Sequence, residues 1–241
     1  MSATRSSEPM VATLSDTLPP LAPNSQRIYL LRHGQTDWNA QGRAQGGGFD
    51  IELNAVGREQ AEVVASELEG VPLDIVASSH LKRAHQTADI LHSIHPGAKR
   101  VVLHGLGEMR FGEFEGCALR GPLSTTETKE RYQSVANTVR QSADVKWPGG
   151  GESTREVENR GRSALQQLLD TEAQHIAVVA HGRFNKIMLS SVLYQDCTKH
   201  LDIVQGNTCV NVLDVSKTDW KPQLLNYVEH VESTISRFAP A

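Results

Sequence analysis

Short apolar runs, each leading into polar residues or glycine, recur along the chain and predict buried β-strands. They are IYLL at 28–31, DIVASS at 74–79, RVVLHG at 100–105, HIAVVAHG at 175–182 and TCVNVLDV at 208–215. Runs of this length without strict alternation are typical of strands covered on both faces. Residues 220–228 predict a further strand at an edge of the sheet, because Pro222 has no N–H to donate to a neighbouring strand.

Between these strands, apolar positions recur at helical spacing. The predicted helices cover 54–68, 81–94, 153–170 and 184–193, with one more near 125–140. In the first helix, one stripe is expected to face inward: Val56, Ala61, Val64, Ala65 and Leu68. Asn54 can cap its start, and Gly70 can end it. Strands that alternate with helices predict an α/β fold, a three-layer sandwich whose mostly parallel sheet carries helices on both faces.

The 241 residues have room for one sizeable domain, and the pattern shows no internal repeat and no second core. Residues 1–25 are rich in Ser, Thr and Pro without apolar periodicity, so a disordered N-terminal tail is expected there. Residues 26–241 are then a single domain. Its weakly periodic segment 109–152 is expected to be an insertion that folds over the site as a cap.

The composition, with 39% hydrophobic and 22% charged residues, is that of a soluble globular protein. A net charge of -4 does not suggest nucleic-acid binding, and no apolar run approaches the ~18 residues of a membrane span. Three scattered cysteines argue against disulfides or zinc and favour a reducing compartment. A cytoplasmic location is expected, since the tail has no secretory core and fits an organellar transit peptide poorly. The oligomeric state is not readable from the sequence.

Polar residues suited to phosphate follow several of the predicted strands. They are Arg32, His33 and Gly34 after the first, Ser78, Ser79 and Arg83 after the second, Glu108 past the third, and His181 and Gly182 after the fourth. In an open α/β sheet the ligand crevice lies beyond the carboxyl ends of the strands. Groups far apart in the sequence are therefore expected to meet in one phosphate site.

The residue types indicate their roles in this site. Arginine offers a planar fork that matches phosphate oxygens, so Arg32 and Arg83 are expected to hold the phosphate. A neutral imidazole is a competent phosphorus nucleophile, which makes His33 the predicted nucleophile. His181 can donate to the transferring phosphoryl oxygens. Glu108 is the candidate acid for the leaving group and then the base for water.

Three further residues are expected at the substrate. Gly34 lets the backbone approach closely, Asn39 can donate another hydrogen bond, and Gly182 follows His181 at the end of its strand. The scheme needs neither a metal ion nor another cofactor, and the sequence has no DxD, HExxH or Walker pattern that would hold one. The predicted partner is a small phosphorylated metabolite.

Six motifs occur in family order: LLRHGQTDWN at 30–39, LNAVGREQA at 53–61, ASSHLKRAHQTA at 77–88, GEMRFGEFEG at 107–116, GGES at 150–153 and VVAHG at 178–182. In them the chain resembles the histidine phosphatase superfamily, in its phosphoglycerate-mutase-like branch, over roughly residues 28–215. The resemblance implies a phosphohistidine on His33 and an acid role for Glu108. It also implies the layered α/β fold and phosphate contacts from the other site residues: Arg32, Asn39, Arg83 and His181.

Departures from the mutase pattern favour the phosphatase side of this family. The mutases carry ERHYG at the acid and FTGW after the first motif. Here Met109 replaces the arginine and Phe111 the tyrosine, while AQGGGFD replaces FTGW. Groups that would hold a phosphoglycerate for return of the phosphate are thus missing, which favours hydrolysis. Cofactor-dependent mutase-type phosphotransfer is the alternative, and a non-catalytic phosphate-binding module is a third and less favoured one.

The identity of the substrate is expected to depend on the predicted cap. Its cations indicate either a second anionic group on the substrate or an ordinary solvated face: Arg110, Arg120, Lys129 and Arg131. The sequence does not decide between the two.

Overall fold

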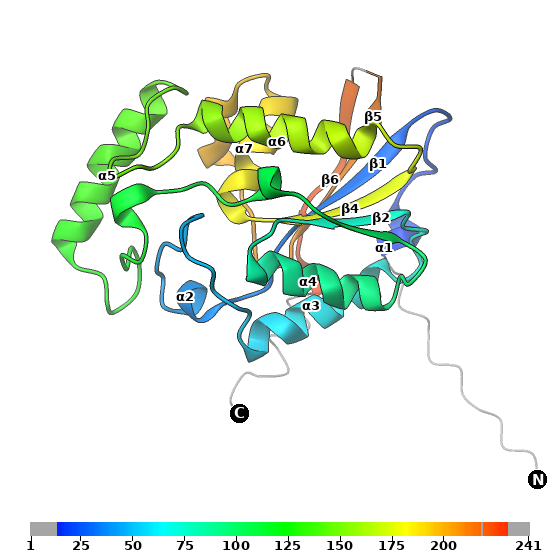
Figure 1. The fold of residues 1–241 in the computed structure, drawn as a ribbon, viewed down its shortest axis with the longest axis horizontal. Coiled ribbons are helices and arrows are strands. Elements are labelled where there is room, and N and C mark those ends of the chain that lie inside the picture. Colours follow the sequence, from blue (N-terminus) through cyan, green and yellow to red (C-terminus); the bar gives the residue numbers. More distant parts are fainter. Residues whose placement is uncertain (1–13, 218, 231–241) are drawn as a thin grey trace, which may run out of the picture.

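The computed structural model describes residues 14–217 and 219–230. At its centre lies a six-stranded sheet with the order β3-β2-β4-β1-β5-β6 (Figure 1). The strands are β1 (Gln26–Arg32), β2 (Ile75–Ser78), β3 (Lys99–Val102), β4 (His175–Ala180), β5 (Val210–Ser216) and β6 (Asp219–Tyr227). Each strand lies within a few residues of the position that its apolar run predicts.

The strand directions explain where a site can form. β3, β2, β4 and β1 run parallel, while β5 pairs antiparallel with β1 and β6 antiparallel with β5. The carboxyl ends of the four parallel strands therefore meet at one edge of the sheet. β6 is the last strand in the order, as Pro222 predicts for a strand that cannot be central.

Helices cover both faces of the sheet, and the three-layer prediction is confirmed (Figure 1). The α-helices are α1 (Leu14–Thr17), α2 (Asp37–Ala40), α3 (Ala55–Leu68), α4 (Lys82–Ser93), α5 (Thr126–Gln141), α6 (Thr154–Leu169) and α7 (Gly182–Leu193). Short 3-10 helices follow at η1 (His104–Leu106), η2 (Gly112–Phe114) and η3 (Cys197–Asp202). α3 and α4 lie on one face, α6 and α7 lie on the other, and α5 lies to one side.

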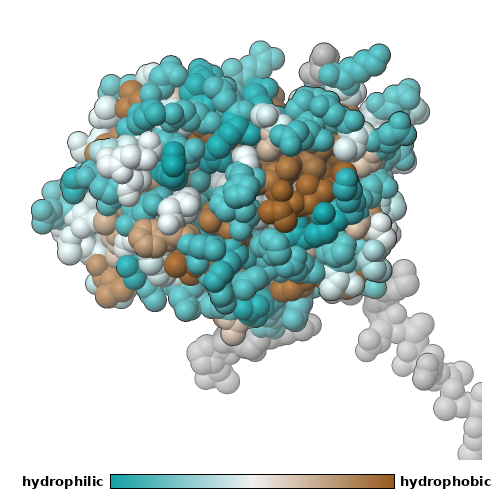
Figure 2. Space-filling model, viewed as in Figure 1, coloured by the Kyte–Doolittle hydropathy of each residue, from teal (hydrophilic) through white to brown (hydrophobic). Residues whose placement is uncertain are grey.

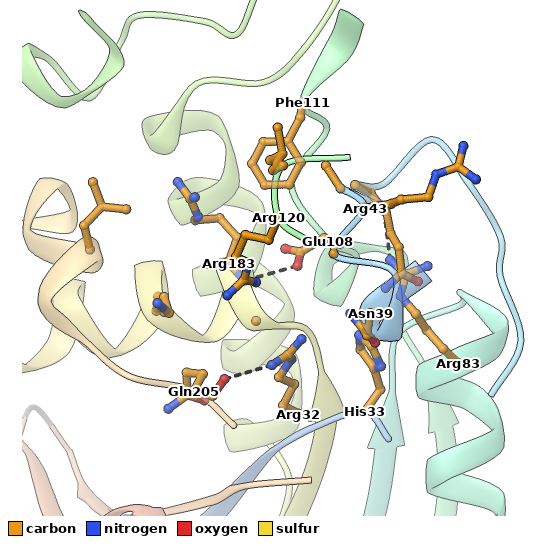
Figure 3. Close-up of a pocket in the computed structure, with 18 of the residues that line it drawn as sticks. Arg32, His33, Asn39, Arg43, Arg83, Glu108, Phe111, Arg120, Arg183 and Gln205 are labelled. Atoms are coloured by element: carbon orange, nitrogen blue, oxygen red, sulfur yellow. Dashed lines mark hydrogen bonds between the residues drawn. The ribbon is translucent and has the colours of Figure 1, made fainter. Parts of the chain in front are cut away.

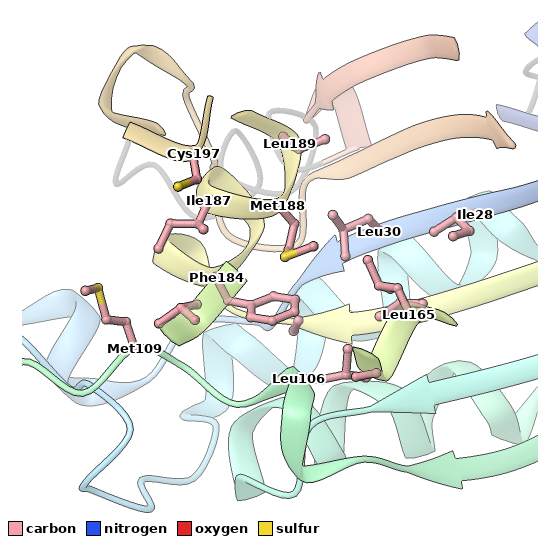
Figure 4. Close-up of a cluster of buried hydrophobic side chains, with 14 of the residues drawn as sticks. Ile28, Leu30, Leu106, Met109, Leu165, Phe184, Ile187, Met188, Leu189 and Cys197 are labelled. Atoms are coloured by element: carbon pink, nitrogen blue, oxygen red, sulfur yellow. The ribbon is translucent and has the colours of Figure 1, made fainter. Parts of the chain in front are cut away.

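Alternate residues of β1 enter different cores. Ile28 and Leu30 pack against α6 and α7 (Figure 4), whereas Tyr29 and Leu31 pack toward α3 and α4. Because side chains alternate across a strand, a strand with helices on both sides is apolar at every position. This is the physical reason for the continuous run IYLL.

The first predicted helix needs one correction. The Asn54 side chain caps α3 by accepting a hydrogen bond of 2.8 Å from the Gly57 amide, as expected. Val56, however, is 44% exposed and does not belong to the inward stripe. In the first turn of α3, the backbone of Gly57 lies against the loop after β1. Because Gly57 faces the protein at this turn, the side chain of Val56, one position earlier, points outward.

The N-terminal boundary also differs from the prediction. Residues 14–17 form α1, Leu14 is buried in the core beside α3, and Arg27 donates to the Pro19 carbonyl at 2.9 Å. The expectation of a disordered tail is therefore wrong for residues 14–25. Leu14 packs into the core ahead of Pro19 and Pro20, and one buried apolar residue gives no periodic pattern in the sequence. Residues 1–13 lie outside the described residues.

The loop after β1 is held by a contact between two glycine backbones. A Cβ on Gly34 would lie 2.3 Å from the Gly57 carbonyl oxygen, and a Cβ on Gly57 would lie 2.0 Å from the Gln35 carbonyl oxygen. Thr87 of α4 adds a further restraint, because its hydroxyl accepts a hydrogen bond of 3.1 Å from the Gly34 amide. The close approach expected of Gly34 is thus an approach to α3.

A Gly57→Ala substitution is therefore expected to destabilise the fold by about 1–3 kcal/mol, because backbone has to move to admit the methyl group. Gly97→Ala is the matched control, since a Cβ there has nothing within 4 Å, and its effect should stay within about 0.5 kcal/mol. Chemical denaturation of the two variants measures the difference. Equal stabilities would contradict the packing role of Gly57.

The surface seen in Figure 2 is mostly hydrophilic, with one larger apolar area on this face. Within residues 14–217 and 219–230, no helix is long and apolar enough to cross a membrane. All three cysteines are free thiols: Cys117, Cys197 and Cys209.

Candidate active site

A cavity of about 410 Å³ opens at the edge where the parallel strands end (Figure 3). Six of the residues assigned to the site from the sequence line it: Arg32, His33, Asn39, Arg83, Glu108 and Gly182. His181 stands directly beside His33, with ring centroids 5.2 Å apart. The structure therefore brings together groups that four separate parts of the chain supply.

His33 is buried and presents a defined nitrogen. Its Nδ1 lies 2.6 Å from the Gly34 carbonyl oxygen, which can only accept, so Nδ1 carries the proton and Nε2 keeps the lone pair. Burial first, and then the charges of Arg83 and Arg32, hold the pKa of His33 well below its usual value. The ring is therefore neutral at pH 7, as a nucleophile requires.

His181 has no exposed surface, and neither of its ring nitrogens has a hydrogen-bond partner among the described residues. Burial, followed by the charge of Arg83, lowers the pKa of His181 well below the usual range. A neutral imidazole with two unengaged nitrogens still has one N–H to donate. Such a group fits an oxygen of a bound phosphoryl group.

Arg32 and Arg83 are anchored by carbonyl groups rather than by carboxylates. Arg32 Nη1 donates to the Gln205 carbonyl at 2.8 Å, and Arg83 donates to the carbonyls of Phe49 and Gly46 at 2.9 and 2.8 Å. The Nε of each arginine is buried without an acceptor in the described part of the chain. Burial lowers the pKa of Arg83 to about 10, which leaves it charged at pH 7.

Gly182 makes room for the first of these arginines. A Cβ at Gly182 would lie 3.2 Å from Arg32 Nε, so the absence of a side chain lets the guanidinium lie against the start of α7. Gly182 therefore contributes to the site by leaving space for the Arg32 side chain.

Glu108 is fixed at the first turn of α7. Its Oε1 accepts from the amides of Met109 and Phe184, both at 2.9 Å, and its Oε2 accepts from the Arg183 amide at 3.1 Å (Figure 3). The carboxyl group lines the cavity, and Oε2, with a single hydrogen bond, keeps a lone pair that can carry a proton.

The loop that carries Glu108 is shaped by an ion pair. Arg160 of α6 donates to the carbonyls of Gly105, Gly107 and Glu108 at 2.8, 2.7 and 3.1 Å, and it pairs with Glu152 at 2.9 Å. Glu152 in turn accepts from the Arg110 amide at 2.9 Å. The glutamate of the GGES motif therefore positions the Glu108 loop from outside the cavity.

Asn39 lies beside His33, and within the described chain only the oxygen of its side-chain amide has hydrogen bonds. Its Oδ1 accepts from the Thr36 amide at 3.1 Å in the capping box of α2. Its side-chain nitrogen has no partner among the described residues, and the residue lines the cavity. Asn39 thus has the donor that the sequence assigned to it. Nearby, Asn207 donates to the His33 carbonyl at 3.2 Å.

Two serines expected near the phosphate do not reach it. Ser78 Oγ accepts from Arg100 at 2.8 Å, Ser79 Oγ accepts from the Leu81 amide at 3.2 Å, and neither residue lines the cavity. The reason is the strand order, in which β4 separates β2 from β1. Only the helix after β2 reaches across, and it carries Arg83.

Of the four cap cations singled out from the sequence, Arg110, Arg120, Lys129 and Arg131, only Arg120 lines this cavity. Arg131 instead pairs with Glu113 at 2.7 Å. Met109 is fully buried in the hydrophobic core (Figure 4) and does not line the cavity, whereas Phe111 forms part of the cavity wall.

The lining residues that the reasoning from the sequence missed include four with polar or charged side chains: Arg43, Arg183, Lys186 and Gln205. A signal existed for two of them. Arg183 and Lys186 lie in the first turns of the helix that follows His181, and such a helix begins next to the site. No pattern marks Gln205, which lies on the loop before β5.

Buried neutral histidines make the fold sensitive to acid. Burial, together with the charge of Arg183, lowers the pKa of His200 to about 4, and the pKa values of His33 and His181 are lowered as well. The unfolded chain then binds protons more readily, so stability is complete above about pH 6.5 and is lost as the pH falls toward 4.

Each of these histidines is expected to remove up to about 1.4 kcal/mol per pH unit in that window. Denaturant unfolding at pH 7, 6 and 5 measures the slope. A His200→Gln variant should show a shallower slope, because its side chain takes up no proton. A stability that stays constant from pH 7 to 5 would contradict the burial argument.

Comparisons with known proteins agree with this geometry. A family model described as the histidine phosphatase superfamily (branch 1) matches residues 28–228. The phosphoglycerate mutase-like protein 4 of Arabidopsis thaliana is 33% identical over 86% of this chain and 87% of its own length. A metal-independent phosphoserine phosphatase of Arabidopsis thaliana is 30% identical over 86% of this chain and 83% of its own. A mycobacterial glucosyl-3-phosphoglycerate phosphatase superposes with a TM-score of 0.72, at 28% identity, over 83% of this chain and 98% of its own.

Proposed function

Because the chain belongs to branch 1 of the histidine phosphatase superfamily and is a phosphoric monoester hydrolase, we propose that it cleaves small phosphorylated metabolites through a phosphohistidine on His33. The observation that carries this proposal is the pair of buried neutral histidines beside Arg32 and Arg83, two arginines without carboxylate partners among the described residues. Such a site offers a lone pair and a positive field to one tetrahedral dianion.

In the first step, the Nε2 lone pair of His33 attacks phosphorus and the bond to the ester oxygen breaks. Arg32 and Arg83 balance the charge on the phosphoryl oxygens, and the N–H of His181 donates to one of them. The leaving alkoxide takes a proton from Glu108 and departs as an alcohol. The enzyme then holds a phosphohistidine and an ionised Glu108.

In the second step, Glu108 removes a proton from water as the water oxygen attacks the phosphohistidine. The P–N bond breaks, inorganic phosphate forms, and His33 and Glu108 return to their starting states. Neither step needs a metal ion, since the two guanidinium groups supply the positive charge.

The segment 109–152 supports release of the alcohol over its return to the phosphoenzyme. Met109 faces the core, and Phe111 adds an apolar wall where a mutase of this family has a tyrosine. Leu119, Arg120 and Tyr132 also line the cavity from this segment, so it acts as the cap that selects the substrate.

The test is a panel of phosphomonoesters assayed for phosphate release in the presence of EDTA. Turnover should persist in the chelator. Loss of activity that added Mg²⁺ restores would contradict the metal-independent scheme. With 3-phosphoglycerate and a bisphosphoglycerate primer, isomerisation without phosphate release would instead establish the mutase alternative.

A further inference from the structure

We propose that Arg183, together with Arg120 and Lys186, forms a second anion subsite in the cavity. This subsite would bind a carboxylate or a second phosphate on the substrate while the scissile phosphate lies at His33. The inference rests on the proposed function, because it concerns the same cavity and the same substrate. These three cations lie outside the sequence motifs of the site, and binding of the scissile phosphate is assigned to Arg32 and Arg83.

Every partner of the Arg183 side chain is neutral. Nη2 donates to the Tyr132 hydroxyl at 3.2 Å, Nη1 lies 3.1 Å from His200 Nε2, and the guanidinium stands 5.3 Å from the centre of the Phe111 ring. His200 Nδ1 donates to the Cys197 carbonyl at 2.9 Å, so Nε2 is the nitrogen that accepts. Contacts from α5, η3 and the Glu108 loop thus hold the guanidinium in place without neutralising its charge.

The other two cations belong to the same positive region. Lys186 is half-buried one turn further along α7, and burial, together with the charges of Arg183, Arg32 and Arg120, lowers its pKa. Arg120 lines the cavity from the cap. Figure 3 shows Arg120 and Arg183 on one side of Glu108, with His33 and Arg83 on the other.

The charge of the cavity exceeds what one phosphate requires. Six cationic side chains and a single carboxylate line it, and none of the six pairs with a carboxylate among the described residues. That carboxylate, on Glu108, already accepts three backbone hydrogen bonds. Arg32 and Arg83 suffice for a phosphoryl dianion. Arg120, Arg183 and Lys186 are therefore free to bind another anionic group of the substrate. The cavity volume of about 410 Å³ is large enough for a whole small metabolite.

Three substrates separate the possibilities. Glycerol 3-phosphate carries one phosphate, 3-phosphoglycerate adds a carboxylate, and fructose 1,6-bisphosphate adds a second phosphate. Wild type should prefer at least one of the two doubly anionic substrates in kcat/KM, and which one identifies the second group. In Arg183→Ala, the ratio of kcat/KM for that substrate over glycerol 3-phosphate should fall about tenfold to a hundredfold, chiefly through KM.

Two controls separate charge from structure. Arg183→Lys keeps a cation at this position, so most of the preference should survive. Arg131→Ala removes an exposed cap cation that pairs with Glu113 and should leave the ratio unchanged. Equal losses of Arg183→Ala on all three substrates would overturn the subsite, as would an undiminished preference or no preference in wild type.

Binding of the same three compounds to His33→Ala, measured by calorimetry, gives the preference without turnover. If the subsite is correct but the proposed chemistry is wrong, His33→Ala still prefers the doubly anionic compounds and loses that preference when Arg183→Ala is added. If only the subsite is wrong, the wild type turns over phosphomonoesters without any such preference.

Discussion

A His33→Ala variant is expected to lose turnover of phosphomonoesters by roughly 10⁴- to 10⁶-fold, the range seen when a catalytic nucleophile is removed. The variant has no lone pair at the position of Nε2, so no covalent intermediate forms. Brief incubation with a ³²P-labelled substrate, followed by a denaturing quench, should give acid-labile label in wild type and none in the variant.

A matched histidine lies on the surface of α4. His85 pairs with Asp89 at 2.8 Å and is outside the cavity, so His85→Ala should keep both turnover and labelling. Circular dichroism of His33→Ala checks that the fold is retained. Label or turnover that persists in a folded His33→Ala protein would exclude His33 as the nucleophile.

The second large effect concerns Glu108. Glu108→Gln is expected to lower steady-state turnover of an alkyl phosphomonoester by roughly 10²- to 10⁴-fold, because no group protonates the alkoxide or activates water. p-Nitrophenyl phosphate should behave differently, since its leaving group departs without a proton. Rapid-quench measurements should show one fast release of p-nitrophenolate, after which phosphohistidine accumulates.

This pattern separates the two catalytic groups, because His33→Ala never labels whereas Glu108→Gln labels and then stalls. Glu113→Gln is the control, as Glu113 pairs with Arg131 and does not line the cavity. Equal slowing of the first turnover with both esters, without accumulated label, would argue that Glu108 only holds the first turn of α7.

The sheet was predictable because β1 and β4 are buried on both faces, which makes their apolar runs continuous and their ends visible. The meeting of Arg32, Arg83 and Glu108 was predictable for a related reason. Parallel strands present their carboxyl ends at one edge, so residues that follow different strands share a site. What each residue does there depends on chemistry and is tested by the variants above.

Other features depend on contacts that no local pattern encodes. Val56 fits the helical stripe, yet it is exposed because the nearby contact is made by glycine backbone. Ser78 and Ser79 follow a strand as His33 does, but the order of the strands sends them elsewhere. In the sequence, Arg183 is indistinguishable from an ordinary surface charge on a helix. Its role depends on contacts with Tyr132 and His200, which come from distant segments.

The buried Nε atoms of Arg32 and Arg83 have a consequence for thermodynamics. Donors without an acceptor raise the free energy of the folded state, and an anion that engages them lowers it again. Because such an anion binds only the folded chain, inorganic phosphate at a hundredfold excess over its Kd would add about 2.7 kcal/mol to the free energy of unfolding. The choice of buffer anion thereby becomes part of the protein's measured stability, and a cell rich in phosphate esters would keep this fold more stable than a phosphate-free solution does.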